Sequence, residues 1–593
     1  MVYNDTGGDN LKIKDVERIT GLTQKAIRLY EARGLIQVAR DENGYRNFSD
    51  KDLAVLKKIK LLRAAGVPIT DIRLYLFGIS TIDEIVDKRK KEILNENGRT
   101  SSQYLFCDGI CEMIAGGKDI KDGFFKENEE FCGEDYGELS VGIDIGTTTI
   151  SAVVFDIENN KQLEAFSLPH SSYICEDIYS EQSVSVIMDK AERLLCHIFE
   201  GYKGIVSIGV TGQMHGIVYI DADGNPISNL INWQDKRADL PLPNGKSVCD
   251  LIKEITGEGI STGYGIATHY YNMLNGTVPS GAVGFCSIMD LLVMKACGLK
   301  KAIAHSSVAA GFGLFDVKAG QFMKEKLSRL GICEDFLPSV TEKSVTVGEY
   351  NGIPVSVAIG DNQASVLGSV KENAPSILVN IGTGSQISAV SEYTEVSDGI
   401  EIRPFIEGKY LICGSALCGG FAYSMLENFF RSYAVSAGME ETAQYKTINL
   451  LAAKAYESGD RGLEVDVSFC GKRSDPNCSG SIKMINRQNF TPSALVIGVL
   501  RGMCDELYEL YGTFRQKRSV IVASGGSIRK NAVLKKLIAE RFGAQVFVNA
   551  VNEEAATGAA LFSALCVGKA KYENGFSSYI KYQQGDSDES VKD

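Results

Sequence analysis

The feature that most constrains this chain is a pattern of strand, glycine turn and strand that occurs twice. The first copy, LSVGIDIGTTTISAVVFD at residues 139–156, is an apolar strand, a tight turn and a second β-rich run. The second copy, SILVNIGTGSQISAVS at residues 376–391, repeats this plan. Successive backbone N–H groups in such turns form a concavity that binds anions. One copy alone would fit a plain β-hairpin with a polar tip, but two copies predict a duplicated fold that closes on one nucleotide.

Side chains around these turns predict a nucleotide and metal site. Asp144 ends the first strand, and Mg²⁺ prefers oxygen ligands such as its carboxylate. A third stretch, residues 519–543, has a strand, a glycine pair that permits close approach of a base or ribose, and then a helix. The predicted nucleotide-binding residues are Gly146, Thr147, Thr148 and Thr149 in the first turn, Gly382, Thr383 and Gly384 in the second, and Gly525, Gly526, Ser527 and Asn531 in the third.

Asp361 is the residue that we expect to carry the chemistry. It follows an apolar strand and precedes a predicted helix in AIGDNQASVLGS. A kinase that acts on a hydroxyl benefits from a carboxylate that orients the hydroxyl and accepts its proton. The alternative is a helix N-cap, the most common role of Asp at such a position. Because Asp361 lies between the two glycine turns in the sequence, we favour the catalytic role.

The ordered motifs DxGTT, GTG and GGS are similar to those of the sugar kinase, heat-shock 70 and actin superfamily. Together with GQMHG, NWQDKRAD and GDNQASVLGS, they resemble the FGGY family of carbohydrate kinases over about 430 residues. The resemblance implies two α/β lobes of ribonuclease-H-like topology at residues 139–375 and 376–568, with ATP and Mg²⁺ as cofactors. It also implies that Asp361 is the catalytic base and that the sugar is bound by Gln213, Met214, His215 and Asn362.

The stretches NWQDKRAD, STGYGIAT, HSSVAAGFGLFD and EIRPFIEGKYLICGSALCGG are similar to the sedoheptulokinase branch of the family, and GQMHG is shared with xylulokinases. We therefore expect phosphorylation of a ketose, either sedoheptulose or a pentulose such as xylulose. Trp233, the only tryptophan, is expected to line the sugar pocket, since an aromatic face stacks on the C–H surface of a sugar, although it could instead pack the domain.

The chain departs from the family pattern in two ways. Many relatives carry Lys or Arg at the position of Ser151, so a positive charge near the nucleotide is missing, and the literal F-G-G-Y string is absent. Two other nucleotide motifs are also missing. Gly245-Lys246-Ser247 lacks the upstream glycine of a P-loop, and no G-x-G-x-x-G occurs, which disfavours Rossmann-type dinucleotide binding.

The first 78 residues predict a separate DNA-binding domain. Two short helices flank Gly21, and Asn43-Gly44 marks a hairpin turn. The string ITGLTQKAIRLYEARGLI, followed by RDENGYRNFSDKDL, resembles the MerR family, a small winged helix-turn-helix domain. This resemblance implies contacts with double-stranded DNA by Lys25, Arg28, Tyr30, Tyr45 and Arg46. For the two tyrosines, burial in the core is the alternative.

Residues 79–138 are expected to hold a dimerisation helix and a connector. The apolar seam at residues 82–94 is short, so the sequence does not decide whether the chain forms a homodimer. Residues 569–593 are expected to form an acidic tail that does not pack. The head also raises a non-enzymatic alternative, in which the body serves a transcription regulator as a sugar sensor.

Charge and cysteine usage agree with this organisation. Residues 1–100 carry 19 basic and 15 acidic side chains, whereas the net charge of the whole chain is -13, so only the head is expected to meet nucleic acid. The 15 cysteines are an odd number spread through a long chain, which favours free thiols and a cytoplasmic location. Cys107 and Cys111 form a close pair that we expect to be spare thiols rather than a metal or redox site. No signal sequence or membrane span is predicted.

Overall fold

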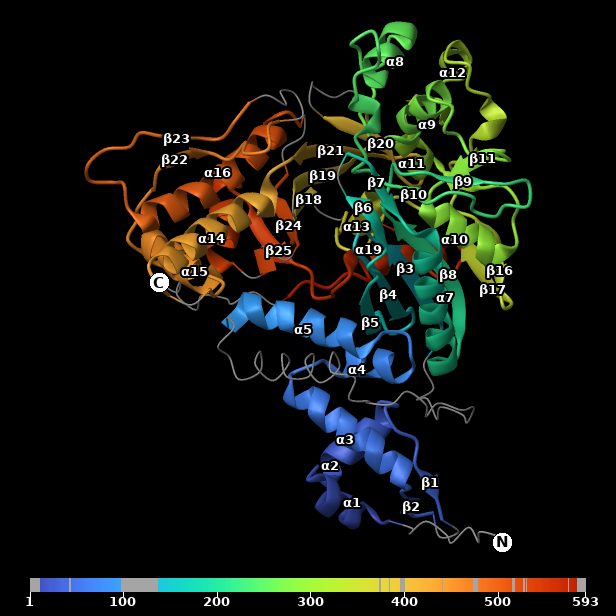
Figure 1. Cartoon of the computed structure of the whole chain (residues 1–593), viewed down its shortest axis with the longest axis vertical. Coiled ribbons are helices and arrows are strands. Elements are labelled where there is room, and N and C mark those ends of the chain that lie inside the picture. The colour runs from blue at the N-terminus through green and yellow to red at the C-terminus, as the bar shows by residue number, and fades with distance from the viewer. Residues whose placement is uncertain are drawn as a thin grey trace. The chain divides into compact units, whose positions relative to one another are not determined.

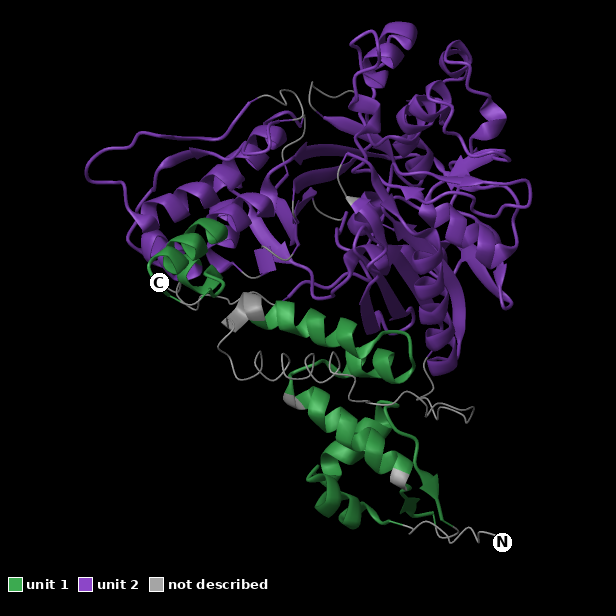
Figure 2. Ribbon diagram, viewed as in Figure 1, with its two compact units in different colours: residues 1–133, 427–448 green, residues 134–426, 449–593 purple. Residues whose placement is uncertain are grey.

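The computed structural model describes most of the chain in two compact units (Figure 2). Unit 1 comprises residues 1–133 and 427–448, and unit 2 comprises residues 134–426 and 449–593. The described residues are 11–41, 44–97, 137–176, 178–372, 375–382, 384–394, 400–439, 441–472, 478–514, 518–525, 528–529, 531–573 and 575–583.

The head in unit 1 is the expected winged helix-turn-helix. Gly21, with φ 66°, ends the first helix, and the Thr23 hydroxyl accepts a hydrogen bond from the Ala26 N–H at 3.2 Å to begin the second. Ser49 and Asp52 form the capping box of the third helix. The elements are α1 (Ile13–Thr20), α2 (Gln24–Ala32), β1 (Ala39–Arg40), β2 (Arg46–Asn47), α3 (Asp50–Ala64), α4 (Ile69–Leu76) and α5 (Ile82–Asn97).

The first lobe of unit 2 is built on a six-stranded mixed sheet in the order β16-β17-β8-β3-β4-β5 (Figure 1). β3, β4 and β5 are antiparallel, whereas β8 is parallel to β3 and β17 is parallel to β8. β3 is buried along nearly its whole length, which explains its continuous apolar sequence. The strands are β3 (Leu139–Ile145), β4 (Thr149–Asp156), β5 (Lys161–Pro169), β8 (Ile205–Gly212), β16 (Thr346–Tyr350) and β17 (Ile353–Ser356).

The second lobe repeats the same plan in the order β20-β21-β19-β18-β24-β25. Three antiparallel strands are again followed by two parallel strands, and only the sixth strand is added at the other edge. This confirms the predicted duplication of a ribonuclease-H-like lobe. The strands are β18 (Ser376–Ile381), β19 (Ser385–Ser391), β20 (Glu401–Pro404), β21 (Tyr410–Ala416), β24 (Val520–Ser524) and β25 (Gln545–Val548).

Two helices join the lobes by packing backbone against backbone. α19 (Glu554–Cys566) follows β25 of the second lobe but packs on β3 and β8 of the first lobe. A Cβ at Gly142 of β3 would lie 1.8 Å from the Ala556 carbonyl, so no larger residue fits there. α13 (Asp361–Leu367) packs on α19, and a Cβ at Gly558 would lie 1.8 Å from the Ala364 carbonyl. This tight crossing fixes the helix that begins at Asp361.

Further helices cover the sheets, and smaller strand pairs extend from the first lobe. α7 (Val184–Gly201) and α10 (Ile288–Cys297) pack on the first sheet, and α16 (Pro492–Gly512) packs on the second. The remaining elements used below are β6 (Tyr173–Glu176), β7 (Ser180–Gln182), β9 (Val218–Ile220), α9 (Gly265–Leu274), α11 (Ser306–Ala309), α14 (Gly419–Ser436) and α18 (Ala532–Phe542).

The described residues after 568 do not form the expected tail. Ala570, Phe576 and Ile580 are buried in the core cluster that also holds α19, so residues 569–573 and 575–583 pack within unit 2. The cysteines in the described ranges are free thiols, and Cys107 and Cys111 lie outside those ranges. In the part of the chain that the structure describes, no helix has both the length and the apolar content needed to cross a bilayer.

Candidate active site

The first glycine turn, residues 146–148, is held by its carbonyl groups. His170 Nε2 donates to the Gly146 oxygen at 3.1 Å, and Gln182 Nε2 donates to the Thr147 oxygen at 2.7 Å. The His170 backbone N–H donates to the Thr148 oxygen at 3.1 Å. In contrast, the N–H groups of these three turn residues donate to no other described residue. The turn therefore presents the donors that a phosphate group requires.

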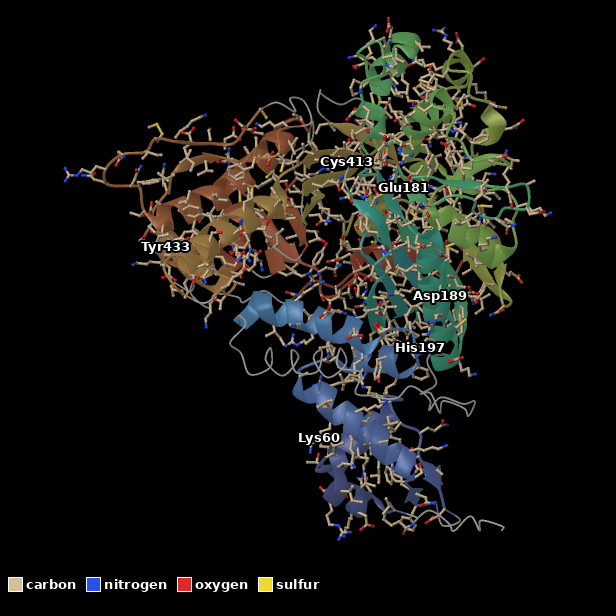
Figure 3. The ribbon with its side chains drawn as sticks, viewed as in Figure 1. Lys60, Glu181, Asp189, His197, Cys413 and Tyr433 are labelled. Carbon is tan, nitrogen blue, oxygen red and sulfur yellow. The ribbon has the colours of Figure 1, made fainter. Side chains whose placement is uncertain are left out.

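Trp233 connects this turn to the predicted sugar side. Its indole Nε1 donates to the Thr147 hydroxyl at 3.0 Å, while 46% of the residue is exposed. The loop that carries it is braced by Arg237, which pairs with Asp235 and with Glu181 of β7 at 2.8 Å each (Figure 3). Trp233 thus has an exposed ring face available for a ligand and a polar edge that is fixed on the phosphate turn.

The carboxyl ends of three parallel strands bring the predicted catalytic residues together. Ile145 of β3 accepts the Gln213 N–H at 2.8 Å, and Val210 of β8 accepts the Ile359 N–H at 3.1 Å. The segments that carry Asp144, Gln213 and Asp361 are therefore neighbours. Sites at the carboxyl ends of parallel strands are typical of α/β sheets.

Electrostatic repulsion shows that Asp144 and Asp361 lie close to each other. Burial, followed by the charges of Asp361 and Glu553, raises the pKa of Asp144 to about 8. Its carboxylate makes no hydrogen bond with the described residues. Ser151 lies directly across β4 from Asp144, so the basic side chain that many relatives carry there is missing beside this carboxylate.

Asp361 is not a helix cap. Gly360 occupies the N-cap position of α13, and the Asp361 carboxylate accepts a hydrogen bond from the Asn362 N–H at 2.6 Å. Burial raises the pKa of Asp361, and the charge of Arg403 partly opposes that shift. A carboxylate with a raised pKa that does not cap its own helix is suited to accept a proton.

The residues around Asp144 fit a divalent cation. An unpartnered carboxylate that is repelled by two others gains stability when a cation neutralises the cluster. However, the described residues contain no group of three His, Cys, Asp or Glu side chains placed to hold a metal. A single protein carboxylate can hold Mg²⁺, because this ion keeps several waters and takes other ligands from substrate phosphates.

The GQMHG string begins where the Gln213 N–H bonds to the end of β3. His215 adopts a left-handed backbone with φ 74°, donates from Nδ1 to the Gly311 oxygen at 2.8 Å and stacks on Tyr264 with ring centroids 4.4 Å apart. Gln213 is buried, and its Nε2 donates to Gln182 at 2.9 Å, whereas its Oε1 is enclosed without a partner in the described chain. Met214 is only 3% exposed.

Asn362 is engaged elsewhere than expected. Its amide nitrogen donates to the Cys413 sulfur at 3.0 Å, and its oxygen accepts from the Ser388 hydroxyl at 3.1 Å. Cys413 is labelled in Figure 3. Both polar atoms therefore link α13 to the second sheet, and in this arrangement they do not face a sugar.

The second glycine turn is held by a helix rather than by side chains. The Gly420 N–H in the first turn of α14 donates to the Gly382 oxygen at 2.8 Å. A Cβ at Gly419 would lie 2.5 Å from the Gly384 carbonyl carbon and oxygen, so only glycine allows this approach. The amino terminus of α14, with its positive dipole end, therefore lies against the turn.

The third glycine stretch adjoins the second. Gly525 has φ 96°, and a Cβ there would lie 2.4 Å from the Ile381 carbonyl, one residue before Gly382. Asn531 is the N-cap of α18; its side chain accepts from the Leu534 N–H at 3.0 Å and donates to the Tyr423 hydroxyl at 3.3 Å. Its buried amide is thus used inside the lobe. Thr383, Gly526 and Ser527 lie outside the described residues.

The predicted DNA-contacting residues of the head fall into two groups. Lys25 and Arg28 are exposed on α2, and Tyr45 is 67% exposed on the wing. Arg46 donates from Nε to Glu31 at 2.5 Å, so it braces the wing against α2. Tyr30 is 7% exposed within the hydrophobic core, which corrects the expectation that its ring meets DNA. Its apolar ring is stabilised by burial between the helices.

Four residues of the site escaped sequence analysis. Gln182 and His170 hold the first turn, Glu553 repels Asp144 from the residue before α19, and Arg403 acts on Asp361 from β20. None lies in a glycine motif. The pair Gly419-Gly420, which follows a strand and begins a helix, is a sequence signal that could have indicated the close approach of α14 to the second turn.

Comparison with known families places the motifs in context. Residues 139–368 match the model of the FGGY family of carbohydrate kinases, N-terminal domain, and residues 380–566 match that of its C-terminal domain. Residues 11–78 match the MerR HTH family regulatory protein model.

Individual relatives have low sequence identity to this chain, but the aligned region covers nearly their whole length. Sedoheptulokinase of Mus musculus is 24% identical over 470 residues, which cover 71% of this chain and 96% of that protein. Xylulose kinase of Staphylococcus xylosus is 24% identical over 459 residues, 72% of this chain and 90% of that protein. The solved gluconate kinase of Lactobacillus acidophilus superposes with a TM-score of 0.65 at 19% identity over 75% of this chain and 93% of that one.

Proposed function

Because the chain belongs to the FGGY family of carbohydrate kinases, we propose that it phosphorylates a ketose with ATP, and that the ketose is sedoheptulose. The position of Asp361 carries this proposal. Asp361 is the first residue of α13, and Gly360 occupies the N-cap position. The charge of Asp361 acts on Asp144, which ends the strand before the first glycine turn.

The proposed reaction uses both lobes. The free N–H groups of residues 146–148 and the turn at Gly382–Gly384 would grip the phosphates of ATP, and Gly525 leaves room for the adenosine side. Asp361 orients a terminal sugar hydroxyl and accepts its proton, while the oxygen attacks the γ-phosphorus in line and ADP leaves. Asp144 would hold Mg²⁺, which offsets negative charge on the phosphates when it is bound. The product from sedoheptulose is the 7-phosphate.

The direct test is Asp361→Ala. General-base catalysis contributes about 10²–10⁴-fold, so we expect ADP production with the ketose to fall by that factor. Sugar affinity, measured by calorimetry, should stay within about threefold because the base makes few ground-state contacts. Asp316→Ala, which removes a carboxylate that bonds to the backbone N–H groups of Lys318 and Ala319 and to no residue of the site, is the control. Equal ADP production by the wild type and the Asp361 variant would contradict the proposal.

The identity of the sugar has a separate test. Sedoheptulose is favoured by the sedoheptulokinase relative, and xylulose is the alternative because a xylulose kinase is similarly related. The wild-type kcat/KM values for sedoheptulose, xylulose and ribulose decide between them. A higher value for xylulose would replace sedoheptulose as the substrate and leave the proposed chemistry intact.

A second function is supported by the head. The MerR match and the exposed Lys25, Arg28 and Tyr45 favour binding to double-stranded DNA. We expect Lys25→Ala with Arg28→Ala to weaken retardation of a target duplex by about tenfold or more, whereas Lys57→Ala on the exposed side of α3 leaves it unchanged. Retardation with and without the ketose tests whether the sugar controls DNA binding. No retarded species under either condition would end this proposal.

A further inference from the structure

Arg403 is a nearly enclosed guanidinium group at the end of β20. Its side chain is 11% exposed, and it is anchored on the neighbouring strand residue Glu401. Nη2 and Nε both donate to Glu401 Oε2, at 2.7 and 3.2 Å. Two of its three nitrogens are therefore fixed in direction by one carboxylate, which makes the group rigid.

The third nitrogen, Nη1, makes no hydrogen bond to the residues that the structure describes. It is also not among the enclosed polar atoms that lack a partner. A buried guanidinium rarely leaves a donor unused, because an unmade hydrogen bond of a charged group costs several kcal/mol when water is excluded. Nη1 therefore points to a position that water or a ligand fills.

That position lies beside the reacting groups. The residue after Arg403, Pro404, accepts the Gln363 Nε2 donor at 2.9 Å, and Gln363 lies two residues after Asp361. The Cys413 sulfur, on the strand paired with β20, accepts the Asn362 amide at 3.0 Å. The end of β20 is thus fixed against the first turn of α13. Arg403 also acts electrostatically on Asp361, and Tyr264, the ring that stacks on His215, acts on Arg403.

The balance of charge indicates the type of ligand. Glu401 already neutralises Arg403, which also acts on Asp361, and Asp361 and Glu553 in turn place negative charge on the surroundings of Asp144. An acidic sugar would be repelled by these carboxylates, whereas a neutral polyhydroxyl compound needs only hydrogen bonds. The ring of Tyr264, which acts on Arg403, and the ring of His215, which stacks on Tyr264, match the C–H faces of such a compound.

We propose that Arg403 is a substrate-binding residue supplied by the second lobe, and that its Nη1 donates to an oxygen of a neutral sugar whose reacting hydroxyl lies at Asp361. This inference rests on the proposed kinase function and adds a specificity determinant to it. Since Asp361 begins α13 and Arg403 lies in β20, one sugar would bridge the two elements. Sugars that lack an oxygen at the Arg403 position should bind poorly, because the guanidinium donor would then stay unpaired.

Arg403→Ala and Arg403→Lys test the contact, with Arg329→Ala as a control that removes an exposed, ion-paired arginine on the remote helix at residues 324–329. We expect both Arg403 variants to weaken ketose binding by at least tenfold in calorimetry without nucleotide. They should raise the KM for ketose similarly and leave the KM for ATP within twofold. Guanidinium ion at millimolar concentration should restore part of the activity of Arg403→Ala, which a purely structural role would not allow.

The outcomes separate the two proposals. If the wild type phosphorylates a ketose and both Arg403 variants bind that ketose as tightly as the wild type, the role of Arg403 is refuted while the kinase function stands. Equal increases of both KM values, with a lower melting temperature and no rescue by guanidinium, would also refute it and show a structural role. If the wild type forms no ADP with any ketose, the kinase proposal itself fails. Gluconate should be at least tenfold poorer than the ketose, and an equal kcat/KM would contradict the argument from charge.

Discussion

The two glycine turns of unit 2 begin at equivalent places in equivalent sheets, yet they are stabilised in different ways. In the first lobe, side chains hold the carbonyl groups of Gly146 and Thr147, and Trp233 donates to the Thr147 hydroxyl. In the second lobe, the backbone of α14 holds Gly382 and packs against Gly384. The first turn can therefore respond to the sugar, whereas the second is a rigid part of a helix start.

The same contrast runs through the chemistry of the lobes. The strand ends of the first lobe carry Asp144, Gln213 and Asp361, whereas those of the second lobe carry glycines. The two sheets thus share their topology, whereas the residues at their strand ends differ. The variants below act on one turn at a time.

The largest effect is expected from Gly419→Ala. Its methyl group would overlap the Gly384 carbonyl, so either the turn or the start of α14 must move. We expect the KM for ATP to rise by about 10–100-fold, since an active-site displacement of about 1 Å can cost 10²-fold, and the affinity for sugar to remain unchanged. Gly438→Ala, at a left-handed position with open space around it after α14, controls for backbone strain. Equal KM values for ATP in the wild type and Gly419→Ala would show that the helix does not hold the turn.

A smaller effect is expected in the first turn. Gln182→Ala removes the donor to the Thr147 oxygen and the partner of Gln213, and it should lower kcat/KM for ATP by about tenfold, as expected for one or two lost hydrogen bonds. Gln321→Ala, an exposed glutamine in the remote hairpin, is the control. If Gln182→Ala were to behave as the wild type, the side-chain tether would be unnecessary.

Trp233→Phe tests the side-chain contacts of the first turn, because it keeps an aromatic ring and removes the indole N–H that donates to Thr147. We expect a two- to fivefold loss in kcat/KM for both ATP and ketose, since a single neutral hydrogen bond contributes about 0.5–1.5 kcal/mol. Steady-state kinetics with each substrate varied will measure it. A loss confined to one substrate would show that Trp233 does not couple the two sides.

Much of this arrangement could be predicted from local sequence. The glycine turns follow apolar strands directly, and Thr23 and Ser49 begin helices because their hydroxyls accept nearby N–H groups. The start of a helix at Asp361 could be predicted from the apolar run before it. In each case the residues that define the feature lie within a few positions of one another.

The remaining features depend on partners that are distant in the sequence. Asn362 and Asn531 match local patterns for ligand contacts, but Cys413, Ser388 and Tyr423 take up their amides. Tyr30 is buried because α2 packs with its ring toward the core of the head. Arg403 has no signal in its own strand, since its role arises from the approach of β20 to α13. Only the folded chain determines such contacts.

The smallest expected effect is on thermal stability. It compares one buried carboxyl group in each lobe, both outside the candidate site. Burial raises the pKa of Asp290 in the first lobe to about 7, and burial also raises that of Glu506 in the second lobe to about 7. A carboxyl with a higher pKa in the folded state binds more protons folded than unfolded between about pH 4 and 7, so stability falls as the pH rises through this range. Asp290→Asn should therefore raise the melting temperature at pH 8 relative to wild type, and not at pH 4.

The expected gain for Asp290→Asn at pH 8 is roughly 1–3 kcal/mol, because the enclosed Oδ1 of Asp290 has no partner in the described chain and the charge is not compensated. Glu506→Gln should show the same pH trend with a smaller change, since Glu506 is less enclosed. Calorimetric melting from pH 4 to 8 measures both. A gain that is independent of pH would contradict the assignment to ionisation.

The measurement that tests the central claim most directly is ADP formation by the wild-type protein with ATP, Mg²⁺ and single ketoses, with the sugar product followed by phosphorus NMR. The account predicts ADP only when a ketose is present, one phosphate monoester formed for each ADP, and the highest kcat/KM for sedoheptulose. ADP formation at the same rate without sugar, or none with any ketose, would contradict it and favour a body that senses sugar without phosphorylating it.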